Sequence, residues 1–228
     1  MFNNLKLKIM ELFKNMKRIS ANRKRFFSII FFFALILNGC SKDDDKMSNP
    51  IADSFSGTIT ANIENGASYN SEISKVFALY EATVNSVTGK LTGKTLGNVE
   101  YINGGFTINI SEIPASSLIN IQTFFSTTLG INGALELSNP DARVLDADFY
   151  AISSDGKYVD YFIYTKTGSK PTTCLFVYAD SEVTVTSGKN VSMALRKGWN
   201  RIYCTPADKK VTSIAPSGMK WFLNKDVK

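Results

Sequence analysis

The stretch Phe55-Ser56-Gly57-Thr58-Ile59-Thr60-Ala61-Asn62-Ile63 decides the fold class, because apolar or small residues alternate in it with polar ones. Side chains on a β-strand point alternately to its two faces, so this period of two indicates a strand with one buried and one wet face. Residues Phe106–Ile110 repeat the pattern, with Thr107 and Asn109 at the polar positions. Together these stretches predict an antiparallel sheet with one face against a core.

Turn dipeptides separate the alternating stretches. Asn103-Gly104 and Asp155-Gly156 supply the positive φ angles of tight hairpins, and Asn65-Gly66, Ser187–Asn190 and Lys197-Gly198 mark further breaks. We expect about ten or eleven strands at the spacing of a sandwich or small barrel. Alternating strands and helices are absent from the pattern, which argues against a parallel sheet.

Residues 54–228 are therefore predicted to form one all-β domain. We expect a single antiparallel β-sandwich, either immunoglobulin-like or transthyretin-like or another Greek key, with one short helix near residues 116–127 that is capped by Ser116 or Ser117. A chain of this length can bury roughly 70% of its unfolded surface, so the core needs no metal or disulfide.

The first 39 residues have the three parts of a secretory signal peptide. A basic segment, Lys17–Arg25, precedes Phe26–Leu37, in which only Ser28 is polar. A helix that spans the ~30 Å hydrocarbon core needs ~20 residues, so we favour a cleaved signal over the alternative of an uncleaved membrane anchor. Met16 is an alternative start of translation, because Met16-Lys17-Arg18 has the sequence expected at the beginning of a signal peptide.

The leader is followed by cysteine in the segment Leu37-Asn38-Gly39-Cys40, which resembles the lipobox of bacterial lipoproteins. The run Ser41, Lys42, Asp43, Asp44 and Asp45 follows, and resembles the acidic export signal of surface lipoproteins of the Bacteroidota. The resemblance implies cleavage before Cys40, lipidation of Cys40, and an outer-membrane location facing the cell exterior. The alternative for the acidic run is a solvated tether without an export role. We expect residues 40–53 to form a lipidated flexible tether with a reach of ~20 Å.

A second resemblance covers most of residues 55–224. The segments Gly104–Ile110, Ala142-Arg143, Tyr178–Asp180 and Leu195–Asn200 are similar to segments of small lipoproteins of Bacteroides and its relatives, a family of unassigned function. This resemblance implies no catalytic residue.

Charge and cysteine content change when the leader is removed. Residues 1–39 contain eight of the 26 Lys and Arg residues and one of the 20 acidic residues, so 18 basic and 19 acidic residues remain, a net charge of −1. The basic footprint of a nucleic-acid-binding protein is then absent.

The mature chain contains two cysteines in addition to Cys40, namely Cys174 and Cys204. They form a disulfide if the fold brings their Cα atoms within ~7 Å, and otherwise are small apolar residues; both alternatives stay open.

The chain contains no histidine, which excludes serine–histidine and cysteine–histidine catalysis and imidazole metal sites. We expect no cofactor and no metal site, since three consecutive aspartates in a flexible segment diverge. An enzyme would need paired carboxylates, such as Asp146 and Asp148, which are two apart on one predicted strand. Asp160 lies on the partner strand, on either the same or the opposite face. The competing interpretation is a polar outer face.

Aromatic residues crowd the strand after Asp155-Gly156. The candidate ligand-binding residues are Tyr158, Asp160, Tyr161 and Tyr164, which would offer ring faces and a carboxylate to a sugar. The alternative is that the tyrosine rings are buried with their hydroxyls at the rim.

The sequence predicts a lipid-anchored surface module that binds a glycan or an outer-membrane partner protein. The alternatives are a histidine-free carboxylate enzyme acting on glycans, and a structural subunit that docks by strand addition. Oligomeric state is not predicted.

Overall fold

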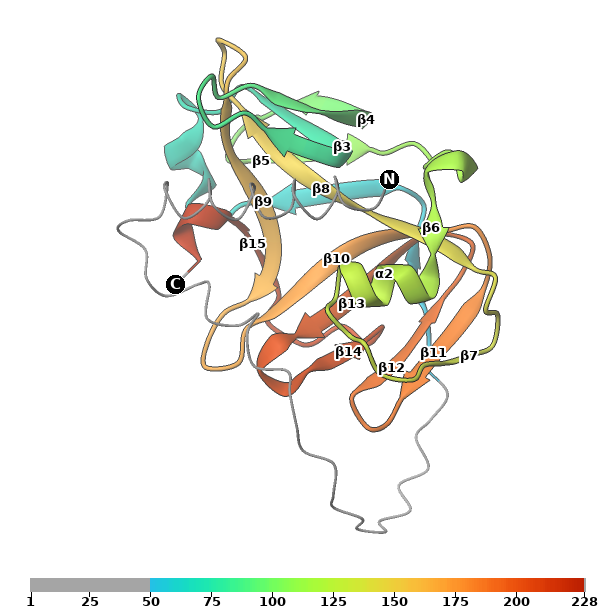
Figure 1. Cartoon of the computed structure of the whole chain (residues 1–228). Helices are drawn as coiled ribbons and strands as arrows, with labels where there is room; N and C mark the ends of the chain where they lie inside the picture. The colour runs from blue at the N-terminus through green and yellow to red at the C-terminus, as the bar shows by residue number, and fades with distance from the viewer. Residues whose placement is uncertain (1–49, 228) are drawn as a thin grey trace. The chain divides into compact units, whose positions relative to one another are not determined.

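The computed structural model describes residues 50–227, and the expectations for the leader, for Cys40 and for residues Ser41–Asp45 lie outside them. The described part is an all-β, sandwich-like fold, which confirms the predicted class (Figure 1). Its strands are β1 (Asp53–Phe55), β2 (Thr58–Asn62), β3 (Lys75–Val84), β4 (Leu91–Glu100), β5 (Gly105–Asn109), β6 (Ile119–Asn120), β7 (Glu136–Leu137), β8 (Arg143–Ile152), β9 (Tyr158–Lys166), β10 (Thr172–Ala179), β11 (Val183–Ser187), β12 (Val191–Leu195), β13 (Gly198–Thr205), β14 (Lys210–Thr212) and β15 (Lys220–Leu223).

One large sheet runs in the order β4-β3-β8-β9-β10-β13-β14-β12-β11-β7, and β2 pairs with β5 in a second, two-stranded sheet. Strand β1 pairs with β13, so Asp53, which we expected to end the tether, lies opposite Arg201 in the sheet. The pairings are antiparallel apart from β12 with β14, where Val191 lies beside Val211, and an isolated bridge between Ile63 and Trp221. At these two places strands that are not consecutive in the sequence meet in parallel within the otherwise antiparallel fold.

The two faces of the large sheet pack against different cores. The inner face carries Phe149, Phe176 and Trp221, which meet Phe106 and Ile108 of the β2–β5 sheet. The outer face of β8, β10 and β13 carries smaller residues, which pack under a helix and the curled β11–β12 end of the sheet; they are Val144, Val177, Ala179 and Ile202. A sheet that is apolar on both faces needs a cover on each, and here the cover of the outer face is only partial.

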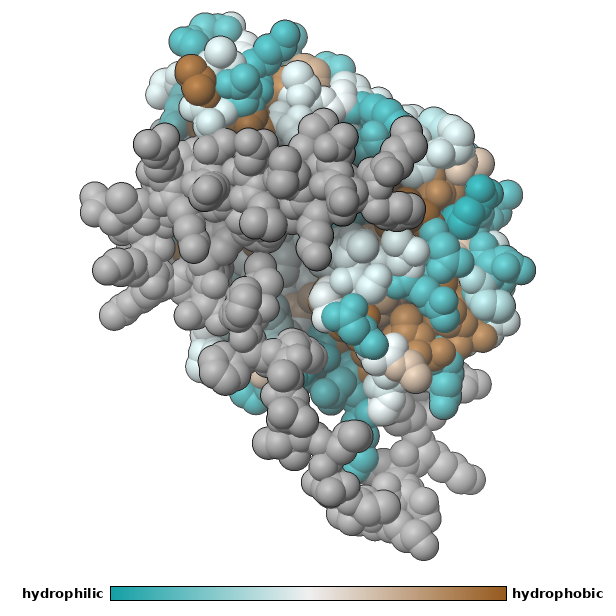
Figure 2. Space-filling model, in the orientation of Figure 1, coloured by the Kyte–Doolittle hydropathy of each residue, from teal (hydrophilic) through white to brown (hydrophobic). Residues whose placement is uncertain are grey.

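The helix is α2 (Ile121–Thr127), which is shorter than predicted and begins later. Asn120, not Ser116 or Ser117, is the N-cap, and its side-chain oxygen accepts a hydrogen bond from the amide of Gln122 at 2.9 Å. Residues Ala115–Ser117 form a separate 3-10 turn. Phe124 and Phe125 bury their rings under the helix, and Figure 2 shows apolar surface around α2 and the segment that follows it.

Two of the predicted turn glycines have the positive φ angles expected of them. Gly104 has φ +79°, and a Cβ there would lie 2.7 Å from the amide nitrogen of Ala67. Gly156 also has a positive φ, +79°, and closes the hairpin between β8 and β9. That hairpin sets the register of the strands that carry the candidate site.

Candidate functional site

A row of aromatic side chains crosses three neighbouring strands on the outer face of the sheet. Phe77 of β3 lies opposite Tyr150 of β8, and Tyr150 lies opposite Tyr161 of β9. Directly paired residues project to the same face, and neighbouring strands are ~4.8 Å apart, so the row is about 10 Å long. All three side chains are partly exposed. Tyr158 extends the row, since its ring centroid lies 6.2 Å from that of Tyr150. We call Phe77, Tyr150, Tyr158 and Tyr161 the tyrosine row.

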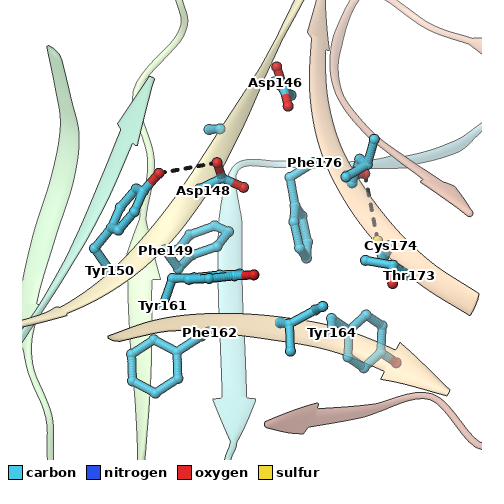
Figure 3. Close-up of a pocket in the computed structure, with 13 residues that line it drawn as sticks. Asp146, Asp148, Phe149, Tyr150, Tyr161, Phe162, Tyr164, Thr173, Cys174 and Phe176 are labelled. Atoms are coloured by element: carbon cyan, nitrogen blue, oxygen red, sulfur yellow. Dashed lines mark hydrogen bonds between the residues drawn. The ribbon is translucent and has the colours of Figure 1, made fainter. Parts of the chain in front are cut away.

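A groove of about 380 Å³ lies at one end of the tyrosine row (Figure 3). It forms because β9 pairs with the C-terminal half of β8, at Phe149–Ile152, and then turns away toward β15, while β10 pairs with the N-terminal half, at Val144–Ala147. The diverging strands leave an opening in the sheet. Its depth is lined by Phe149 and Phe176 of the inner core, so the groove has an aromatic floor.

Two carboxylates stand on the wall of this groove. Asp146 and Asp148 lie two residues apart on β8 and share the outer face with Tyr150. The Tyr150 hydroxyl donates a hydrogen bond to Asp148 Oδ2 at 3.2 Å (Figure 3). Asp148 remains open to solvent at the mouth of the groove, and Asp146 is half-buried.

The environment disfavours negative charge on these groups. Burial raises the pKa of Asp146 above its ordinary value. Although Asp148 lies exposed at the mouth of the groove, the surrounding protein atoms displace water from its carboxyl group. This desolvation and the neighbouring charge of Asp146 raise the pKa of Asp148 to about 6, an effect that the hydrogen bond from Tyr150 opposes. Burial, with charge from Asp160 and Asp148, raises the pKa of Tyr161 to about 12. The tyrosines are therefore neutral hydrogen-bond donors at physiological pH, and the site is rich in acceptors.

The structure divides the four predicted ligand residues between two faces. Tyr158 and Tyr161 belong to the tyrosine row, but Asp160 lies opposite Ala151 and projects to the inner face. Tyr164 is also on the inner face, where its ring stacks on Trp221 at 5.2 Å. The four candidates therefore do not form one surface. The period of two separates Asp160 and Tyr164 from Tyr161, and a register shift between Asp160 and Tyr158 places Tyr158 on the side of Tyr161.

Asp160 is a buried carboxylate with a structural role. It is 8% exposed, and its Oδ1 accepts a hydrogen bond from the amide of Tyr161 at 2.9 Å. Its Oδ2 accepts one from the amide of Lys225 at 2.8 Å, in the C-terminal turn Asn224–Asp226. Asp160 thus ties β9 to the end of the chain and does not face the groove.

The cysteines do not pair. Cys174 lies opposite Tyr203 and Cys204 lies opposite Thr173, so on adjacent strands the two thiols point to opposite faces of the sheet. Both are free, which settles the alternative that the sequence left open. Burial raises the pKa of Cys174 well above its ordinary value and that of Cys204 to about 12, so neither is a reactive thiolate.

A second, smaller cavity of about 290 Å³ lies on the inner side, beyond Tyr164 and Phe176. There Arg201 Nη1 is 3.2 Å from Asp53 Oδ1, and the Tyr203 hydroxyl donates a hydrogen bond to Asp53 Oδ2. These contacts join β1 to β13 and satisfy the carboxylate from two sides. We assign them a structural role.

Comparison with known proteins gives no further guide, since no protein-family model, curated protein or solved structure matches this chain. Within residues 50–227, no three acidic, cysteine or histidine side chains are grouped so that they could hold a metal ion. No helix in that same range is both long and apolar enough to cross a membrane.

The sequence alone did not identify the tyrosine row as one surface, although the hairpin that forms part of it can be predicted from the sequence. The hairpin at Asp155-Gly156, together with a register shift next to Tyr158, places Tyr150 opposite Tyr161 and Asp160 on the other face. The contribution of Phe77 could not be found in this way, because β3 joins β8 through a long-range pairing.

Proposed function

We propose that the chain is a lipid-anchored cell-surface module that binds a glycan on the outer face of β3, β8 and β9. The single observation that carries the proposal is the tyrosine row beside a groove with two carboxylates. Partly exposed tyrosine rings offer flat apolar surface together with hydroxyl donors, and carboxylates accept hydrogen bonds from sugar hydroxyls. Strands hold these groups in a fixed arrangement, so little ordering entropy is lost on binding.

The surrounding surface supports this location. Phe77, Tyr150 and Tyr161 are partly exposed, whereas their neighbours Leu79 and Ile152 on the same side of β3 and β8 are buried. The exposed apolar surface at this place is therefore formed by the aromatic rings. A strip of apolar residues rimmed by polar groups is typical of a recognition surface.

A second candidate function is glycan hydrolysis, and it is favoured by the raised pKa of Asp148 beside Asp146. Residues two apart on a strand have Cα atoms about 6.7 Å apart, and inverting glycosidases hold their carboxyl groups roughly 6.5–9.5 Å apart. An acid with a pKa near 6 is suited to donate a proton to a leaving group. This candidate requires that both carboxylates flank the scissile bond.

Docking by strand addition is the least supported function. Strand β4 ends the sheet, but its pairing with β3 contains two register shifts, one between Ala78 and Leu79 and one around Glu81, which has φ +51°. Lys94 on β4 forms an ion pair with Glu81 at 2.9 Å. Bulges and lysines on an edge strand oppose the addition of another strand.

A glycan array probed with the chain from Ser41 onward tests the proposal, since this chain contains every described strand. The proposal expects binding that is lost in Tyr161→Ala and retained in Asp155→Asn, a change on the exposed hairpin tip. Release of reducing ends from the bound glycan, lost in Asp148→Asn, would favour the hydrolase instead. Absence of binding to every glycan would contradict both.

A further inference from the structure

We infer that, among glycans, the groove selects sugars that carry a free amino group. This inference rests on the proposed function and specifies the ligand of the same site. The observation behind it is the joint presence of an aromatic enclosure and unbalanced negative charge at one place in the fold.

The lining of the groove has only one sign of charge. Its described residues include Asp146 and Asp148 and contain no lysine or arginine. On the same side of the sheet Lys75 lies farther along β3, where its ammonium group is 3.6 Å from Glu100. An ammonium group on a ligand would therefore supply the positive charge that the groove lacks, and a carboxylate or sulfate on a ligand would add repulsion.

The aromatic rings strengthen this preference. Tyr150 and Tyr161 lie opposite each other on neighbouring strands and both line the groove, and the ring of Tyr158 next to Tyr150 is tilted from it by 57°. Cations are attracted to the faces of tyrosine rings, and enclosures of several rings with an acidic partner recognise ammonium groups. The Tyr150 hydroxyl already hydrogen-bonds Asp148, which holds the carboxylate beside the rings.

Aromatic residues alone would not make this distinction. A neutral sugar, an N-acetylated sugar and an amino sugar have similar ring faces, and would stack on tyrosine to similar extents. The carboxylates change the ranking because they interact with the charge at the amino position. Asp146 and Asp148 are therefore specificity-determining residues, whereas Tyr161 contributes to the binding of all these sugars.

The test compares a short chitosan oligomer with the N-acetylated oligomer of the same length, by calorimetry with the chain from Ser41 onward. The two ligands share a backbone and differ in the charge of the amino group. We expect the chitosan oligomer to bind about tenfold more tightly at about pH 6, where the amine is protonated and the bound ammonium group draws Asp148, whose pKa is about 6, to its ionised form. Asp146→Asn with Asp148→Asn should remove that tenfold preference, because the affinity for the chitosan oligomer should fall about tenfold more than the affinity for the N-acetylated oligomer.

Two matched variants separate this mechanism from its competitors. Asp155→Asn removes a carboxylate of the β8–β9 hairpin outside the groove and should leave the preference intact. Tyr161→Ala should weaken both oligomers, whereas non-specific attraction of a polycation would survive it. Equal or tighter binding of the N-acetylated oligomer would overturn the inference and keep the proposed function. Failure of both oligomers and of every neutral glycan to bind would overturn the proposed function itself.

Discussion

Replacing Asp160 with alanine should destabilise the domain, because its carboxylate satisfies two main-chain amides. These are the amide of Tyr161 at 2.9 Å and that of Lys225 at 2.8 Å. A buried amide that loses its partner costs about 1–3 kcal/mol. Lys225 is half-buried, so water can reach its amide in part. We therefore expect the free energy of unfolding to fall by about 2–4 kcal/mol in total.

Urea unfolding of the chain from Ser41 onward measures this change, and a loss of that size corresponds to a melting temperature lower by roughly 5–15 °C. Asp155→Ala is the matched control, since it removes a carboxylate from the exposed tip of the same hairpin, and should unfold close to wild type. Hydrogen exchange in residues 224–227 should accelerate in Asp160→Ala alone. The reasoning is refuted if the two variants unfold at the same urea concentration.

Three further predictions follow from individual residues. Thiol titration of the denatured chain from Ser41 onward, without reductant, should find both Cys174 and Cys204 reactive; a single disulfide per chain would contradict the observed register. Cys40→Ser should abolish incorporation of labelled palmitate and leave an uncleaved precursor, and labelling equal to wild type would exclude the lipobox. Asp148→Asn should raise stability at about pH 8 and not below about pH 4, because a carboxyl pKa raised to about 6 opposes folding once the group ionises; an equal gain at both pH values would contradict this.

The strands were predictable wherever local chemistry determines them. The alternation at Phe106–Ile110 became β5, and Thr58–Asn62 of the stretch Phe55–Ile63 became its partner β2, with Ile59 opposite Ile108. Phe55 lies instead in β1, because the chain breaks at Gly57, which has φ +89°. The Asp155-Gly156 turn joined β8 to β9 as expected. These elements depend on residues that are close together in the sequence, and their side-chain period is visible directly.

The arrangement of the site was not predictable to the same extent. The outer-face groove exists because β9 leaves β8 and β10 replaces it, and strand divergence of this kind has no signature in the sequence of any one strand. The start of the helix was also misjudged, since Asn120 caps it only after Ile119 pairs with Val144 in a two-residue strand. In both cases a tertiary contact decides a local outcome.

The most direct test of the central claim is to locate the bound glycan by hydrogen–deuterium exchange. The measurement compares the chain from Ser41 onward with and without the tightest oligosaccharide found on the array. The account predicts slower exchange in residues 146–150 and 158–163, and no change around Asp53 and Arg201 in the second cavity. Protection confined to that second cavity, or to the β4 edge, would contradict the assignment of the tyrosine row as the binding site.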